Sequence, residues 1–530
     1  MRNIFKRPMP VKHVLVDKLS QSNKDADSGS NESEELQKIN KISKNVQENK
    51  KIMQDRFRNS LDVVFYEFKT ISGIKALVVY IDELAKKETL DRDVINPFIL
   101  ESNNGAPKPS DEAPNYKSFN DFKKLFPVTN TLELSDFHEV VNNILAGNTV
   151  VFIESMTFAI SIACRGWEKR EIQEPMSEMV VRGPKEGFIE SININRALIR
   201  RKIRNENLVF ESMEIGRQTK TVINIVYIDG IVSKDVLNEV RRRLAKIDVD
   251  SILDAGNIEE YIEDSHISPV STVANTQKPD VVAAKILEGR VGIMCDGSPH
   301  VLTVPHLFIE TIQTSEDYYN RPYIATLLRI IRLLALAVSV LFPAVYVSLE
   351  TFHQDMIPSV FLITTAGANV GTPFPAFLEA LIMVTAFEFL KESGTRMPKA
   401  IGSAISIVGA LVLGDAAVKA GIISADLIVV IAFTAVATFI IPSLNEVVTL
   451  YRLFLLILSG IMGIYGVTAG VFMIVIHANS LRSFGVPFMS PISPINLEGL
   501  KDSAIRFPFW SMSKRPSFIS GENKTRRGNM

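Results

Sequence analysis

The sequence predicts an α/β soluble region of two related subdomains, followed by an all-α polytopic transmembrane helical bundle. Charged residues crowd positions 1 to 322, whereas 323 to 477 contains long apolar runs broken by single charges. Only lipid or a very large core tolerates apolar runs of that length. The chain averages of 46% hydrophobic residues, net charge −1 and mean hydropathy +0.15 therefore combine two unlike parts.

The N-terminal segment of the chain carries positive charge but no apolar stretch behind it. We therefore expect no secretory signal peptide and a soluble region in the cytosol. Residues 15–50 are rich in Ser, Asn and charge and poor in aromatic residues, so they bury too little apolar area to offset the entropy of ordering. The net charge near zero argues against nucleic acid as a partner.

A repeated pattern indicates the two subdomains. Val78-Val-Tyr-Ile-Asp82 returns as Ile225-Val-Tyr-Ile-Asp229, and the segment ending in Gly147 returns with Gly289. After each glycine comes one strand that ends in an acid and a small residue, and then a second strand. Two copies of one unit, each with a buried strand, a helix capped by glycine and a β-hairpin, are the simplest account. Chance similarity among apolar strands is the alternative.

These patterns divide the chain into six parts. They are a disordered arm (1–50), a first cytosolic α/β subdomain (51–165), a basic helical connector (166–206), a second cytosolic α/β subdomain (207–320), a transmembrane domain of about five spans (321–482) and a basic tail (483–530). The connector helix, 190–203, gathers basic residues. They form either a solvated helical face or a surface that docks on anionic headgroups or an acidic partner.

The first expected span, 324–349, carries Arg329 and Arg332 in its first turns. We expect both side chains to snorkel to the cytosolic interface and fix the orientation of the helix. Residues 357–390 are apolar but broken by glycine and proline, and they include two intramembrane acids, Glu379 and Glu388. Acids inside a membrane are functional by default, although either one can also sit at an interface.

The next span, 401–413, has a stripe of small residues at every fourth position, which usually means close helix packing. In an oligomer the opposite face of this helix instead rings an axis and forms an apolar constriction, with Asp415 at its mouth. The pore candidates are Ile407, Val408, Leu411 and Asp415.

The remaining expected spans are 427–442 and 453–477, and glycines give the last one a packing face. Five spans would leave the basic tail outside the cell, against the positive-inside rule. A sixth crossing or a re-entrant segment would remove the conflict, and the sequence does not choose between them.

No enzyme signature is found, so we expect no catalytic residue, no metal and no cofactor. His138-Glu-Val-Val-Asn142 begins like a zinc helix but lacks the second histidine, and there is no phosphate-binding glycine loop. Cys164 and Cys295 lie in apolar strand-like runs and are expected to be buried free thiols.

Several motifs resemble the A subunits of GerA-type spore germinant receptors. They are Arg182-Gly183-Pro184-Lys-Glu-Gly-Phe-Ile-Glu190, Thr303-Val-Pro-His-Leu-Phe-Ile-Glu310, Ser315-Glu-Asp-Tyr-Tyr319, Thr351-Phe-His-Gln-Asp-Met-Ile-Pro358, Pro373-Phe-Pro-Ala-Phe-Leu-Glu-Ala380 and Leu481-Arg-Ser-Phe-Gly-Val-Pro487. The likeness runs in collinear order over residues 60 to 495. It departs from the family pattern at Asp415-Ala-Ala417, where a polar Gln is usual, and at Asn369-Val370, where Arg-Glu is usual.

The resemblance implies a multi-pass receptor subunit in the spore inner membrane with its soluble region in the cytosol. Such a subunit would associate with itself, with membrane lipid, with a transporter-like B subunit and with a lipoprotein C subunit, and its oligomer would release cations when nutrient binds. The alternatives are an accessory spore channel that amplifies ion release without sensing nutrients, and a secondary transporter. A transporter should repeat its membrane halves, and here only the soluble part shows a repeat.

Overall fold

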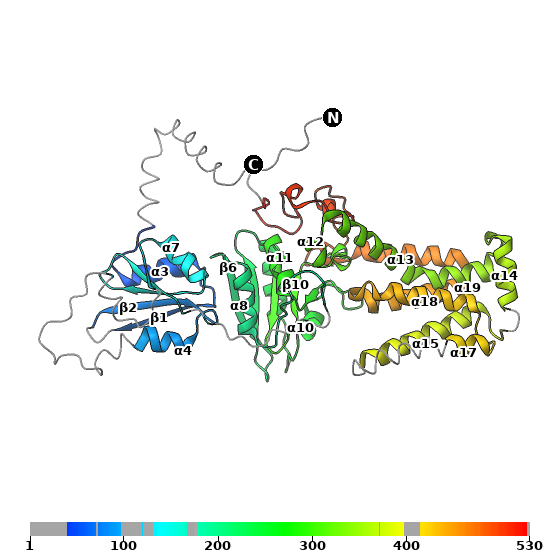
Figure 1. Ribbon diagram of the computed structural model, residues 1–530, viewed down its shortest axis with the longest axis horizontal. Helices are drawn as coiled ribbons and strands as arrows, with labels where there is room; N and C mark the ends of the chain where they lie inside the picture. The colour runs from blue at the N-terminus through cyan, green and yellow to red at the C-terminus, as the bar shows by residue number, and fades with distance from the viewer. Residues whose placement is uncertain are drawn as a thin grey trace, which may run out of the picture. The chain divides into compact units, whose positions relative to one another are not determined.

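The computed structural model describes residues 40–69, 73–96, 119, 131–164, 166, 175, 178–369, 372–396 and 414–526. The chain forms two compact units, one of residues 1–169 with 204–206 and one of residues 170–203 with 207–530 (Figure 1). Each unit is described by itself.

The first unit is a five-stranded antiparallel sheet with helices on both faces. Its strands lie in the order β1-β2-β4-β5-β3. The strands and helices are α3 (Val46–Arg56), β1 (Val63–Lys69), β2 (Lys75–Ile81), α4 (Lys87–Leu90), β3 (Thr131–Leu134), α7 (Phe137–Leu145), β4 (Thr149–Ile153) and β5 (Ala159–Ile162). β2, β4 and β5 are almost entirely buried, which explains their continuous apolar sequences.

The second unit begins with a sheet of the same kind, in the order β6-β7-β9-β10-β8. Its elements are α8 (Ile192–Lys202), β6 (Leu208–Ile215), β7 (Thr221–Ile228), α9 (Lys234–Leu244), α10 (Ala255–Ile262), β8 (Ala274–Thr276), α11 (Pro279–Glu288), β9 (Val291–Cys295) and β10 (Val301–Val304). One apolar core joins α9 and α10 to one face of the sheet, and another joins α8 and α11 to the opposite face.

The repeated sequence segments occupy equivalent places in the two sheets. The Val-Tyr-Ile-Asp segments fall on β2 and β7, the second strand of each order. Gly147 and Gly289 both follow a helix and both have positive φ, 86° and 106°, a conformation that glycine adopts at low cost. Cys164 and Cys295 are buried free thiols, as expected.

The basic connector helix is not a solvated face along its length. Arg200 of α8 is fully buried, donates to the Leu208 carbonyl at 3.0 Å, and lies 5.2 Å from the Phe210 ring centroid. Arg201 and Lys202 pair with Glu186 at 3.2 Å each. Both proposed uses of this helix, solvated face and headgroup-docking surface, are therefore wrong for Arg200.

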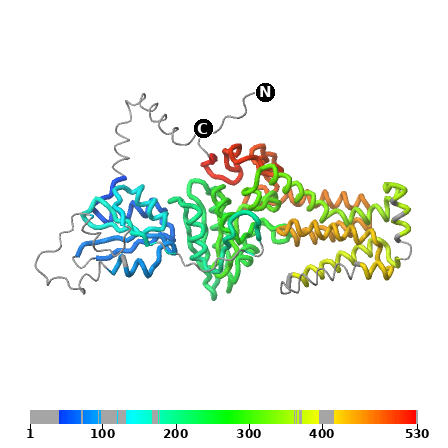
Figure 2. Tube along the Cα trace, in the orientation of Figure 1, coloured from blue at the N-terminus to red at the C-terminus, as the bar shows by residue number. Residues whose placement is uncertain are grey.

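The helices that follow the second sheet are α12 (Glu316–Tyr319), α13 (Pro322–Phe352), α14 (Ser359–Asn369), α15 (Ala376–Arg396), α17 (Gly414–Lys419), α18 (Ala425–Phe439) and α19 (Asn445–Ser480). Of these, α13, α18 and α19 run side by side (Figure 2). Among the described residues, two helices are long and apolar enough to cross a membrane: Pro322–Phe352, which is α13, and Pro442–Ser480, which is α19 with the helical turn before it.

α19 is not the single straight span that the sequence suggests. Gly463 has φ 60° and ψ −140° inside it, a conformation essentially restricted to glycine. A Cβ placed on Gly470 would lie 2.4 Å from Leu455, which is possible only if the two arms of α19 fold back on each other. The bend contacts Phe352, at the end of α13 that is far from the sheet.

The tail after α19 packs on the second sheet. Phe484 belongs to the core on the α9 and α10 face, and its backbone N–H donates to Asp264 at 2.8 Å. The Ser483 hydroxyl donates to the Thr272 carbonyl at 2.6 Å, and Gly521 N–H donates to the Ile231 carbonyl at 2.8 Å. At the start of α19, the Ser443 hydroxyl donates to the Thr311 carbonyl at 2.8 Å, so both ends of α19 are at the sheet end of the helices.

Candidate functional site

The expected pore lining falls mostly outside the described residues. Ile407, Val408 and Leu411 are in the stretch 397–413, so their role as a constriction stays a prediction. Asp415 lies in the first turn of α17, where its exposed carboxylate pairs with Lys419 at 2.5 Å. A pair of this kind, one helical turn apart and in solvent, contributes little to stability.

The two predicted intramembrane acids both engage neighbouring helices. Glu379 on α15 is 3% exposed and accepts a hydrogen bond from the backbone N–H of Ser424, the residue before α18, at 3.2 Å. A carboxylate at this place meets unpaired backbone donors and the positive end of the helix dipole. We therefore interpret Glu379 as a cap that fixes the start of α18 against α15.

Glu388 belongs to a buried cluster around Arg452 of α19, which we call the arginine cluster. Arg452 is 1% exposed and lies 3.2 Å from Glu388. Its guanidinium also donates to the Thr438 hydroxyl on α18 at 2.6 Å and to the Ser339 carbonyl on α13 at 2.8 Å. Lys391, one turn beyond Glu388, forms a close ion pair with the same carboxylate and donates to Thr449 at 3.1 Å.

The bond to Ser339 has a local cause in the sequence. Pro343 lies four residues further along α13 and has no N–H to donate to the Ser339 carbonyl. A carbonyl freed inside an apolar bundle has to find another donor, because its burial without one costs free energy. Arg452 supplies that donor, and the arginine cluster thereby joins α13, α15, α18 and α19.

A second buried cluster, the junction cluster, lies where α13 meets the sheet and the tail. Arg329 donates to Asp317 of α12 and to Asp502 of the tail, each at 2.9 Å. Arg332 also donates to Asp317 at 2.9 Å, and the Tyr318 hydroxyl donates to Asp502 at 2.9 Å. The expectation that Arg329 and Arg332 snorkel to the interface is wrong, because acids of two other segments bind them inside the protein.

The junction cluster shifts the acidity of its members. Burial would raise the pKa of Asp317, but hydrogen bonds from Arg332 and Arg329 outweigh it and lower that pKa below the ordinary value. Burial raises the pKa of Asp502 despite Arg329, and burial also raises the pKa of Tyr318 well above its usual range. Asp317 is therefore the carboxylate that the two arginines hold ionised.

The loop 181–190 reaches the opposite side of α12. The backbone N–H groups of Val181 and Arg182 donate to Glu316, the latter at 3.1 Å. Gly183 has φ 139°, and a Cβ there would lie 2.8 Å from the Tyr319 ring. α12 is thus held by the loop through Glu316 and Tyr319 and by α13 through its two central residues.

The other predicted motif residues anchor this loop to the sheet. The Pro184 carbonyl accepts a hydrogen bond from the Lys278 ammonium at 3.1 Å. The Glu190 carbonyl accepts one from the Gly297 N–H at 2.8 Å. Both contacts use backbone atoms, so they require the path of the loop more than its side chains.

Sequence reasoning missed the partners in both clusters. Arg452 stands alone in an apolar run and Pro343 lies within a predicted span, so each was visible as an exception to its surroundings. Asp317 lies within a motif that resembles the family, but the resemblance implied no function for its side chain. Asp502 gave no signal, because it lies 173 residues from Arg329 in the chain.

Comparison with known proteins gives the family. The family model of Bacillus/Clostridium GerA spore germination proteins matches residues 51–518. The chain is 41% identical over 492 residues to spore germination protein KA of Bacillus subtilis, covering 92% of this chain and 88% of that protein. It is 37% identical to the uncharacterized membrane protein YfkQ of the same organism, covering 91% and 93%.

A solved structure also matches, that of the N-terminal domain of the A subunit of the Bacillus megaterium spore germinant receptor GerK3. It shares 29% identity with this chain, with a TM-score of 0.37, and the match covers 51% of this chain and 97% of that one. The family model, over residues 51–518, runs through both sheets, the helices and most of the tail. The chain therefore belongs to the GerA family of spore germination proteins.

Proposed function

We propose that this protein is the A subunit of a nutrient-responsive germinant receptor in the spore inner membrane. It assembles with copies of itself, with a transporter-like B subunit and with a lipoprotein C subunit, and the oligomer releases cations when nutrient binds. Family membership over residues 51–518 is the observation that carries this proposal. The helices beside the second sheet supply a membrane domain of suitable length.

The membrane domain crosses the bilayer six times in this proposal. The bend at Gly463 divides α19 into two arms, and residues 445–462 of the first arm span about 27 Å at about 1.5 Å per residue. The other crossings are α13, α15, the span predicted over 401–413, and α18. An even number keeps the basic tail on the side of the sheets, which removes the conflict with the positive-inside rule.

The two buried clusters give the receptor a route from the soluble part to the pore. A shift of the loop 181–190 moves α12, and Asp317 transmits the shift to Arg329 and Arg332 of α13. α13 is tied through Arg452 to Glu388 of α15. α15 leads directly into the stretch 397–413 that holds Val408, the residue proposed to narrow the pore.

Potassium release from purified spores tests the proposal. Wild-type spores, Val408→Phe spores and spores with the smaller control Val408→Ala receive a mixture of amino acids, sugars and nucleosides, with the protein level matched by immunoblot. We expect release to be lost with phenylalanine and retained with alanine, because only the bulky ring blocks an apolar constriction.

Unchanged release with phenylalanine would move the pore to another helix or make the protein a scaffold. A second experiment measures potassium release from spores that lack the B and C subunits. Nutrient-triggered release should then stop for a receptor subunit, and its persistence would favour an accessory channel.

A further inference from the structure

The tail after α19 exposes large apolar side chains although it is firmly held. Ile505, Phe507, Phe509 and Trp510, which we call the tail patch, are 54%, 41%, 58% and 73% exposed. The same tail buries Phe488 and Ile519 completely, so the exposure is not the result of a loose segment. Apolar side chains held out in this way mark an interaction surface.

The tail patch lies beside the start of α13. The backbone N–H of Arg506, in the middle of the patch, donates to the Thr326 hydroxyl at 3.1 Å. Its guanidinium donates to the Asn320 carbonyl at 3.1 Å and lies 4.7 Å from the Phe509 ring centroid. The patch is therefore fixed at the first turns of α13.

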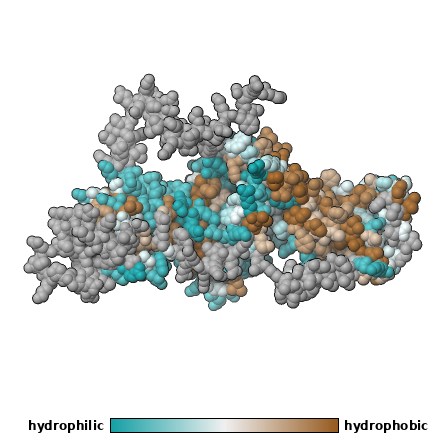
Figure 3. Space-filling model, in the orientation of Figure 1, coloured by the Kyte–Doolittle hydropathy of each residue, from teal (hydrophilic) through white to brown (hydrophobic). Residues whose placement is uncertain are grey.

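The outer face of α13 at this level is also apolar. Tyr323, Leu327 and Leu334 are 61%, 55% and 61% exposed. Brown, apolar residues cover the start of the helices in Figure 3. The tail patch thus extends sideways from the surface that α13 presents to lipid in the proposed topology.

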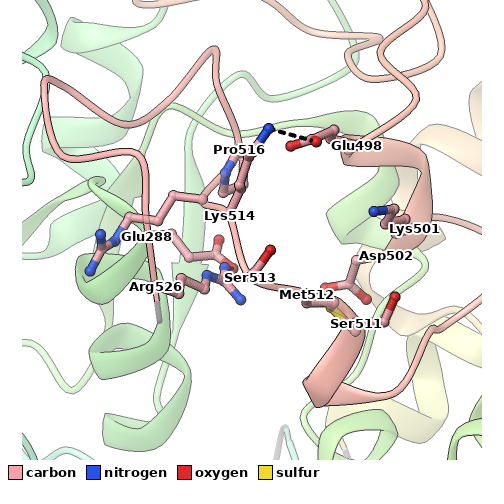
Figure 4. Close-up of a pocket in the computed structure, with 12 residues that line it drawn as sticks. Glu288, Glu498, Lys501, Asp502, Ser511, Met512, Ser513, Lys514, Pro516 and Arg526 are labelled. Carbon is pink, nitrogen blue, oxygen red and sulfur yellow. Dashed lines mark hydrogen bonds and ion pairs between the residues drawn. The ribbon is translucent and has the colours of Figure 1, made fainter. Parts of the chain in front are cut away.

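The charge of the tail matches an anionic surface. Residues 482–530 contain eight Lys or Arg and three Asp or Glu. Lys501, Lys514, Arg515 and Arg526 line an open hollow between the tail and the end of α11, together with the acids Glu288, Glu498 and Asp502 (Figure 4). Lys514 pairs there with Glu498 at 2.9 Å and Arg526 pairs with Glu288, so the four basic residues exceed the three acids by one charge. Exposed aromatic rings next to lysine and arginine are typical of segments that lie in the headgroup region of a membrane.

We propose that the tail patch lies in the headgroup region of the leaflet on the soluble side, so that the C-terminal tail is an in-plane membrane anchor. Phe509 and Trp510 enter the boundary between headgroups and acyl chains, and the basic residues of the tail bind anionic headgroups. The anchor holds Asp502, and through it Arg329, at a fixed depth. The inference rests on the proposed membrane domain.

Fluorescence of Trp510 tests the anchor, because the chain has two tryptophans, Trp167 and Trp510. The full-length Trp167→Phe protein is reconstituted in vesicles of phosphatidylcholine and phosphatidylglycerol that carry bromine near the carbonyl or near the methyl end of the acyl chains. We expect most of the Trp510 emission to be quenched by the shallow bromine and little by the deep one.

The control fluorophore is Leu253→Trp in a chain that also carries Trp167→Phe and Trp510→Phe. Leu253 is 73% exposed and lies next to Gly297, at the end of β10 away from the helices. Its emission should be unaffected by either bromine. Flotation of the vesicles shows separately whether the protein has inserted.

Inserted protein whose Trp510 is quenched by aqueous iodide but by neither bromine would overturn the anchor and leave the patch for a protein partner. Stronger quenching by the deep bromine would also contradict an in-plane position. Loss of the shallow quenching in vesicles of phosphatidylcholine alone is expected if the basic residues contribute. Failure to float would instead contradict the membrane domain of the proposed function.

Discussion

The two α/β subdomains share a strand order but differ in what completes them. The described apolar core on the α4 side of the first sheet consists of residues of that subdomain alone, between 64 and 164. The core of the second sheet includes Phe484 from the tail, 180 residues beyond β10 at Val304. The second subdomain therefore cannot complete its core until the helices have brought the tail back.

The difference shows how one architecture serves two purposes. Both sheets have the antiparallel order that buries their central strands. Only the second is followed by α12, whose Asp317 receives the two arginines of α13. The second subdomain is therefore the one that is joined to the helices through buried ion pairs.

The largest difference in stability loss between the two units is expected when one ion-paired carboxylate is removed from each. Asp317→Ala leaves Arg332 without a carboxylate partner and Arg329 with Asp502 alone, both in a buried site, which costs about 3–5 kcal/mol. Glu67→Ala in the first unit removes a half-exposed partner of Lys50 and costs about 1 kcal/mol or less. Thermal unfolding of the full-length protein in detergent measures both, and Asp317→Ala should lower Tm by about 10 °C.

The effect of Asp317 should depend on pH in one direction. Its pKa is lowered below the ordinary 3.8, so the stabilisation is fully present above that value and is lost as pH falls through the folded-state pKa. The Tm difference between wild type and Asp317→Ala should be constant near neutrality and shrink in strong acid.

Similar losses of Tm in Glu67→Ala and Asp317→Ala near neutral pH would remove the distinction between the two units.

A smaller difference in stability loss is expected at Gly147 and Gly289, which occupy equivalent places in the two subdomains. Gly147→Ala introduces a side chain at φ 86° and costs about 1–2 kcal/mol in the first subdomain. Gly289→Ala carries the same strain at φ 106°, and its Cβ would also lie 3.0 Å from the Ser520 Cα of the tail. Displacing the tail adds about 1–3 kcal/mol.

Limited proteolysis of a protein with a C-terminal epitope tag separates these two effects. The tag should be released faster from Gly289→Ala than from wild type, while Gly147→Ala should release it at the wild-type rate. Equal release from both variants would show that Gly289 does not support the tail.

The sheets were predictable and the return of the tail was not. The repeated Val-Tyr-Ile-Asp segments mark equivalent strands, because a strand buried on both faces needs a continuous apolar sequence. The bend of α19 uses Gly463, one of four glycines spaced along a predicted packing face. Sequence cannot tell which of them takes positive φ, since the contact with Phe352 of another helix decides it.

Of the two buried clusters and the Glu379 cap, the sequence predicted only single residues that stand out from their apolar surroundings. Glu379 and Glu388 were found because acids in apolar runs are conspicuous, and their partners Ser424 and Arg452 come from helices whose arrangement depends on the whole bundle. The proposed constriction at Val408 lies outside the described residues and remains a prediction.

Buried backbone carbonyls find their hydrogen-bond donors differently in the sheets and in the helices. In the sheets, backbone carbonyls accept hydrogen bonds from backbone N–H groups of the neighbouring strands, whereas the Ser339 carbonyl of α13 accepts one from a side chain of α19. The dependence follows from Pro343, so replacing the proline should remove it.

The smallest predicted effect is the coupling between Pro343 and Arg452. In Pro343→Ala the new N–H can bond to the Ser339 carbonyl, so Arg452→Leu should cost about 1 kcal/mol less in that background than in wild type. Tm values of the two single variants and the double variant measure this coupling as a difference of about 2–4 °C. The ion pair of Arg452 with Glu388 is lost in both backgrounds and cancels. Additive Tm changes would mean that Arg452 stabilises the bundle through its other partners, Glu388 and Thr438, and the carbonyl freed by Pro343 would then be no part of the link between α13 and α19.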